Sequence, residues 1–163
     1  MKIKEFLKDY DKLIILGIGN ELRGDDGFGS YIINLIENEL KTATNNSNFK
    51  NNIILIDGGS APENFTGQIK RENPSHIIIV DAAIMGSEPG TIKFIEEDEI
   101  ANISVSTHSM SLSFLIKYLK KDIDFELLFI GIEPFSMNLG EELSSEIIEK
   151  AIYIKDIIIP YLI

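Results

Sequence analysis

The sequence contains no cysteine. Disulfides, thiolate zinc sites, iron–sulfur clusters and a cysteine nucleophile are therefore excluded. Basic residues are also few, since 15 lysines and arginines stand against 26 acids and give a formal net charge of −11. A nucleic-acid binder needs a basic face for phosphate contacts, so this charge argues against nucleic acid as a partner. Any bound metal must be held by oxygen and imidazole ligands.

Long apolar runs are missing as well. No stretch of roughly 18 residues is free of charged side chains, and the segment Met1–Glu5 lacks the apolar core of a signal peptide. We therefore expect a cytoplasmic protein without a membrane partner. A length of 163 residues with 44% hydrophobic residues suits a single domain, residues 1–163, which we expect to be monomeric.

A glycine- and acid-rich segment, Gly17–Gly29, follows an apolar run and precedes a helical pattern. This order is typical of a nucleotide-binding unit, but Gly24 comes two residues too late for the dinucleotide fingerprint Gly-x-Gly-x-x-Gly. Asp25 and Asp26 stand where a phosphate loop has its lysine and hydroxyl residue. Two carboxylates repel a polyphosphate and attract a cation, so we expect no nucleotide cofactor.

The two aspartates have a simpler alternative explanation. Asp25 can cap the following helix, and Asp26 can complement the positive end of the helix dipole. We assign the cap to Asp25 and regard Asp26 as the better candidate for chemistry.

Strand and helix patterns alternate along the chain. Apolar runs predict buried strands at Leu13–Leu16, Ile53–Asp57, His76–Asp81 and Phe125–Ile132, and alternation predicts an edge or antiparallel strand at Gly90–Ile95. Helices are predicted at Tyr31–Ile36, Glu63–Arg71 and Glu141–Ile158, and another begins at Ser106 or Thr107 with the apolar stripe Met110, Phe114, Leu115, Tyr118 and Leu119. This order predicts an α/β fold, a three-layer α/β/α sandwich around a mostly parallel twisted sheet of about five strands.

Four ligand-type side chains are expected at one edge of that sheet. Asp26 follows the first strand, Asp57 and Asp81 end the second and third, and His108 begins a helix. Parallel strands direct their carboxyl ends to one edge, where ligands bind in such folds. Two carboxylates and an imidazole suit a borderline divalent metal such as zinc or nickel. The alternative is structural: strand-end aspartates often accept backbone hydrogen bonds, and a histidine at a helix start often caps it.

Other candidate groups are weaker. His76 begins its strand and therefore belongs to the opposite edge, where we expect a structural role. Serines surround His108, but no Gly-x-Ser-x-Gly elbow is present, which argues against serine catalysis. Glu133 ends the last strand and either lines the same cleft or merely precedes a proline turn.

The assembled motifs resemble the [NiFe]-hydrogenase maturation proteases, in particular those of the hydrogenase 3 type. The matching segments span Leu13 to about Pro134. They are Gly17-x-Gly19-Asn20, Gly24-Asp25-Asp26-Gly27-x-Gly29, Ile56 to Asn64, Val80-Asp81-Ala82, Met85-Gly86, Pro89-Gly90, Thr107-His108-x-Met110-x-Leu112 and Leu128 to Ile132.

The resemblance implies a metal-binding and catalytic trio of Asp26, Asp81 and His108. It leaves Asp57, with Gly58 and Gly59, to shape the cleft floor for the substrate. Glu133 stands where the similar protease has glutamine, which adds a charge at the substrate-binding edge of the cleft.

The resemblance also implies a reaction. Such proteases, classed as aspartic-type endopeptidases, remove a short C-terminal extension from the hydrogenase large-subunit precursor after nickel insertion, so the expected nickel belongs to the substrate. The metal can polarise the scissile carbonyl or activate water, or a carboxylate can act as general base. A non-catalytic, nickel-sensing maturation chaperone that binds the same precursor is the alternative.

Overall fold

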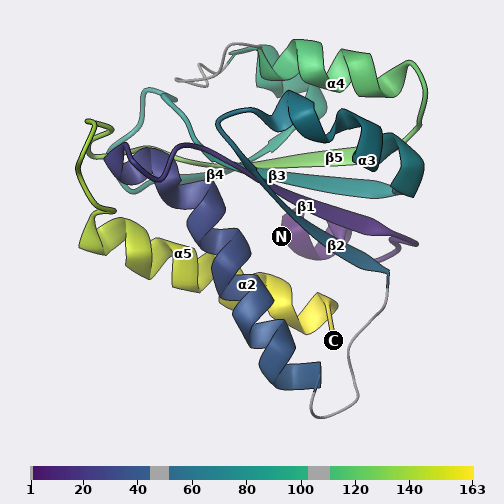
Figure 1. Cartoon of the computed structure of the whole chain (residues 1–163), viewed down its shortest axis with the longest axis horizontal. Helices are drawn as coiled ribbons and strands as arrows, with labels where there is room; N and C mark the ends of the chain where they lie inside the picture. The colour runs from purple at the N-terminus through teal and green to yellow at the C-terminus, as the bar shows by residue number, and fades with distance from the viewer. Residues whose placement is uncertain (1, 45–51, 103–110) are drawn as a thin grey trace.

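The computed structural model describes residues 2–44, 52–102 and 111–163, which form a five-stranded sheet with helices on both faces (Figure 1). The strands, in the spatial order β2-β1-β3-β5-β4, are β1 (Leu13–Ile18), β2 (Ile53–Gly59), β3 (His76–Ala82), β4 (Ile92–Glu96) and β5 (Glu126–Ile132). All neighbours are parallel except β4, which pairs antiparallel with β5 at the sheet edge. The predicted mostly parallel sheet and its antiparallel edge strand are both confirmed.

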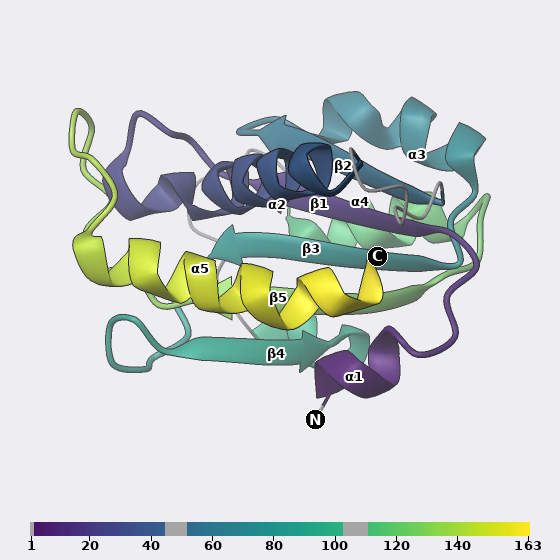
Figure 2. The same cartoon turned by 90° about the horizontal axis from the view of Figure 1, so that it is seen from below.

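The helices complete the predicted sandwich. They are α1 (Lys2–Phe6), α2 (Phe28–Thr44), α3 (Thr66–Glu72), α4 (Leu112–Lys120) and α5 (Ser145–Ile158). Figure 1 shows α2 and α5 below the sheet and α3 and α4 above it, and Figure 2 shows α2 and α5 side by side from below. No helix within the described ranges combines the length and apolar character required to cross a membrane.

Successive side chains of each central strand point alternately into the two layers of the core. Ile15 and Ile78 belong to the apolar cluster that contains α2 and α5, whereas their neighbours Ile14 and Ile77 belong to the cluster on the α3 and α4 face. All four side chains are at most 1% exposed. Strands buried on both faces must be apolar at every position, which explains the continuous apolar runs in the sequence.

Glycines let α2 begin directly over the ends of β1 and β3. A Cβ atom on Gly29 would lie 2.5 Å from the Val80 carbonyl oxygen and would overlap the backbone of Ile18. A Cβ atom on Gly17 would lie 2.6 Å from the Ile33 side chain. Gly17 in β1 and Gly29 in the first turn of α2 therefore permit close packing between the helix and the sheet.

The start of α4 differs from the sequence-based prediction. The helix begins at Leu112, and the Ser111 hydroxyl caps it by accepting a hydrogen bond from the Phe114 N–H at 3.2 Å. The predicted cap at Ser106 or Thr107 is therefore wrong for this helix, and those residues, with His108 and Met110, lie outside the described ranges. Leu115 and Leu119 are buried as predicted. Phe114 and Tyr118 are instead exposed, because the apolar stripe is narrower than the sequence pattern indicated.

Candidate active site

Asp26 and Asp81 lie at the carboxyl edge of the sheet, at its switch point. The strand order places β2 and β3 on opposite sides of β1, so the loops that leave these strands diverge there. Asp26 belongs to a short 3-10 helix, η1 (Gly24–Gly27), which packs against β3, and Asp81 is the penultimate residue of β3. Both side chains are fully buried.

Gly19 lies between the two acids. Its φ of 141° is a conformation that other residues rarely adopt, and a Cβ atom there would overlap the Asp26 carbonyl oxygen. The same Cβ atom would lie 3.7 Å from Asp81 Oδ1. The Asn20 N–H also donates to Asp26 Oδ2 at 3.1 Å, which fixes the orientation of this carboxylate.

The burial of two carboxylates at one edge favours a bound cation. Removing an ionised carboxylate from water costs several kcal/mol, roughly, unless a proton or an opposite charge compensates it. Asp26 also precedes α2, whose first turn carries partial positive charge. Two oxygen donors in a polar, partly dry site suit a divalent metal that keeps open coordination positions.

The third predicted ligand, His108, lies outside the described residues, so its place in the trio stays a prediction. Within the described part, α4 follows it in the sequence and runs antiparallel to β5, with its first turn toward the carboxyl edge (Figure 1).

Asp25 does not cap its own helix, which corrects the sequence-based assignment. Its buried carboxylate accepts hydrogen bonds from the backbone N–H groups of Phe135 at 2.9 Å and Ser136 at 3.2 Å. It also accepts two from Ser144, from the N–H at 2.8 Å and from the hydroxyl at 2.9 Å. Ser144 is the N-cap residue of α5. Asp25 therefore links the loop between β1 and α2, which carries Asp26, to the loop between β5 and α5 by hydrogen bonds.

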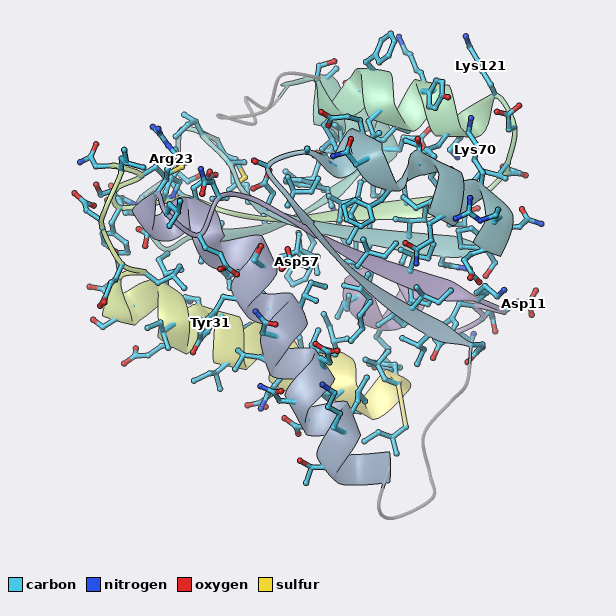
Figure 3. All side chains as sticks on the ribbon, viewed as in Figure 1. Asp11, Arg23, Tyr31, Asp57, Lys70 and Lys121 are labelled. Atoms are coloured by element: carbon cyan, nitrogen blue, oxygen red, sulfur yellow. The ribbon has the colours of Figure 1, made fainter. Side chains whose placement is uncertain are left out.

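The segment Asp57-Gly58-Gly59 lies beside the same loop, at the end of β2. Asp57 Oδ1 accepts the Ser30 hydroxyl at 2.6 Å and the Gly59 N–H at 3.2 Å, although the residue is exposed. Figure 3 shows Asp57 next to α2. The Gly59 carbonyl accepts the Gly19 N–H at 2.8 Å, so this segment supports the loop that carries Asp26.

Glu133 reaches the same edge, and the residue is buried, with only 5% of its surface exposed. Its Oε1 accepts the N–H groups of Met85 at 2.9 Å and Ser87 at 2.8 Å. Its own N–H donates to the Thr91 carbonyl at 2.9 Å. Glu133 therefore holds the loop between β3 and β4, which begins after Ala82, one residue beyond Asp81. A contact with substrate stays a prediction.

The opposite edge of the sheet carries His76, for which we expected a structural role. His76 begins β3, and its ring packs at 5.0 Å against Phe6 and at 6.4 Å against Tyr10. Its predicted place at the edge opposite Asp81 is confirmed, and these ring contacts support a structural role. Among the described residues, one group of three carboxylates has oxygen atoms within 4.8 Å of one another, and all three side chains are exposed: Glu96, Asp98 and Glu99.

Comparison with known proteins decides the family. Residues 35–159 match the family model HycI, described as hydrogenase maturation protease. The chain belongs to the hydrogenase maturation protease family. A putative hydrogenase maturation protease from Methanocaldococcus jannaschii is 44% identical over 128 residues, which are 78% of this chain and 75% of that protein. The hydrogenase 3 maturation protease of Escherichia coli is 42% identical over 122 residues, 74% of this chain and 72% of the relative.

Solved structures of the family share the fold. The crystal structure of a [NiFe] hydrogenase maturation protease from Thermococcus kodakarensis superposes with a TM-score of 0.87 at 27% identity and covers 99% of both chains. The solution structure of an Escherichia coli endopeptidase of the HycI type gives a TM-score of 0.73 at 34% identity, over 89% of this chain and 87% of that one. This hydrogenase maturation protease is therefore an endopeptidase with the α/β fold of its family.

Proposed function

We propose that this protease removes a short C-terminal extension from the large-subunit precursor of a [NiFe] hydrogenase after nickel has been inserted. The family membership supports the maturation role. The observation that carries the proposal is the complete burial of Asp26 and Asp81 at the switch point of the sheet, because such a pair recognises a cation. In this scheme the nickel arrives with the substrate, and only a loaded precursor completes the site.

Asp26, Asp81 and His108 are the residues that we assign to the substrate's nickel. A three-ligand set leaves coordination positions open for a peptide carbonyl or a water molecule. The reaction adds the hydroxyl of water to the carbonyl carbon, breaks the carbon–nitrogen bond and transfers a proton to the leaving amine. Activation of water by the metal and general-base catalysis by a carboxylate remain the two routes.

Asp57, Gly58, Gly59 and Glu133 are the residues that we assign to substrate binding. The support is their position, because Gly59 is hydrogen-bonded to Gly19 and Glu133 holds the loop that follows Asp81. An extended substrate segment can then pass between these loops on its way to the two acids.

The test is the intact mass of a large-subunit precursor incubated with the protease, with and without nickel. We expect a loss of mass equal to the C-terminal extension, only when the precursor carries nickel. Asp26→Asn and Asp81→Asn should slow cleavage by at least about 100-fold, since each removes charge from the proposed metal site. Asp98→Asn, which changes an exposed acid at the far edge, is the matched control and should cleave normally.

Two results would contradict the proposal. Normal cleavage by both site variants would remove Asp26 and Asp81 from the mechanism. A stable complex with the precursor and no change in mass would favour a non-catalytic chaperone instead.

A further inference from the structure

Two leucines near the site are the most exposed large hydrophobic side chains of the described residues. Leu139 is 73% exposed and Leu22 is 68% exposed. Leu22 belongs to the loop between β1 and α2 that also carries Asp26, and Leu139 belongs to the loop between β5 and α5. Neither side chain contributes much to the core, so the stability of the fold does not account for them.

The backbones of these two loops are joined to each other. The Gly140 N–H donates to the Leu22 carbonyl at 2.7 Å, and the Gly24 N–H donates to the Glu141 carbonyl at 3.0 Å. The two loops run side by side in both Figure 1 and Figure 2, at the left end of the molecule. The buried carboxylate of Asp25 adds four further hydrogen bonds between the same segments. The leucines are thus presented by an ordered unit, which reduces the entropy lost when a partner binds.

The charged side chains of the two loops are mostly acidic. Glu21, Glu141 and Glu142 are exposed, and Arg23 is the only basic residue of residues 19–27 and 133–144. Hydrogen bonds from Ser136 and Asn138 lower the pKa of Glu141, so its carboxylate is charged at neutral pH. An apolar centre with an acidic rim complements a partner surface that has apolar side chains surrounded by lysine and arginine.

We infer that Leu22 and Leu139 form a docking edge for the folded body of the large-subunit precursor, whose contact surface is apolar with a basic rim. This inference rests on the proposed function, because the occupant is the molecule whose tail is cleaved at Asp26. The edge is continuous with the site, since Leu22 and Asp26 share one loop. A precursor whose tail reaches Asp26 therefore comes to the loop that also presents Leu22.

The experiment is steady-state cleavage of nickel-loaded precursor by Leu22→Ser, Leu139→Ser and the double variant. Both side chains are exposed, so thermal unfolding should match that of the wild type. We expect KM to rise about tenfold in the double variant while kcat stays within about twofold, because only binding remote from the chemistry is lost. Added salt should raise the KM of the wild type. Ile152→Ser, which changes a 41% exposed residue on α5, is the matched control and should leave KM unchanged.

An unchanged KM in a folded double variant would overturn the docking edge, and so would a fall in kcat without a change in KM. Failure of the wild type to cleave any precursor would instead contradict the proposed function. In that case the dissociation constant of the wild-type complex with precursor, compared with that of the double variant, still tests the edge. Equal constants would overturn it, and a tenfold weaker complex would support it.

Discussion

Asp25 and Ser144 are joined by two hydrogen bonds, in which the serine N–H donates to Oδ1 and the serine hydroxyl donates to Oδ2. Ser144 is the N-cap residue of α5, yet its hydroxyl bonds to a carboxylate from the other end of the chain rather than to its own helix. The adjacent Asp26 accepts a hydrogen bond from Asn20 inside its own loop. Two neighbouring, fully buried aspartates therefore have different environments, and we expect their substitution to have different effects on stability.

Asp25→Asn should lower the free energy of unfolding by about 3 kcal/mol, because an amide nitrogen would face backbone N–H donors and buried groups would lose charge-assisted bonds. Asp26→Asn should leave the metal-free protein as stable as the wild type or more stable by about 1 kcal/mol, because it removes a buried charge. Urea unfolding of both variants without nickel measures the difference. Equal destabilisation by the two substitutions would contradict this account.

Glu133→Gln should keep the loop between β3 and β4 in place, because one amide oxygen can accept both N–H groups that Oε1 accepts now. Its free energy of unfolding should stay within about 0.5 kcal/mol of the wild-type value. Glu133→Ala leaves the Met85 and Ser87 donors without their acceptor and should cost about 2 kcal/mol. Denaturant unfolding of the two variants separates the contribution of the hydrogen bonds from that of the charge. A large loss of unfolding free energy in the glutamine variant would show that the charge itself is required.

Gly29→Ala should destabilise the protein by about 3 kcal/mol, since the new methyl group would push α2 away from the ends of β1 and β3. The control is Gly67→Ala in α3, where the nearest atom to a new Cβ is the flexible end of Arg71 at 3.3 Å. This control should stabilise the helix by about 0.5 kcal/mol, because alanine loses less backbone entropy on folding. Melting temperatures that shift in the same direction for both variants would argue against close packing at Gly29.

His76 should make stability depend on pH. Its pKa is lowered from 6.5, chiefly by burial, with a smaller opposite effect from the nearby acids Glu126, Asp11 and Asp9. The unfolded chain therefore binds a proton at higher pH than the folded chain does, so the stabilising contribution is present above pH 6.5 and declines as the pH falls below it. His76→Gln should reduce this decline. Urea midpoints measured on either side of pH 6.5 test it, and identical pH profiles of variant and wild type would exclude His76 as the cause.

The sheet was predictable from sequence because its central strands β1, β3 and β5 are buried on both faces. Continuous apolar runs mark β1, β3 and β5, and the alternation at Gly90–Ile95 correctly indicated the antiparallel edge strand. The convergence of Asp26 and Asp81 at one edge follows from the parallel topology, which brought Asp57 and His108 into the same candidate set. The family resemblance, not the strand ends, separated Asp57 from the proposed metal ligands.

The interactions within the loops were not predictable in the same way. The donors to Asp25 come from Phe135, Ser136 and Ser144, which lie far along the chain, and no local pattern encodes them. Local rules therefore favoured a helix cap, since that is the short-range use of an aspartate before a helix. Glu133 was ambiguous for a related reason, because its partners lie in another loop.

The link between Asp25 and Ser144 also has a consequence for the order in which a chain leaving the ribosome acquires its site. The loop that carries Asp26 is synthesised early, but its hydrogen bonds to the N-cap of α5 can form only after Ser144 has been synthesised. A chain that has not yet reached Phe135 lacks all four hydrogen bonds to Asp25, and one that ends between Ser136 and Ser144 lacks two of them. The arrangement of this loop therefore depends on the start of α5 as much as on β1, although the two lie far apart in the sequence.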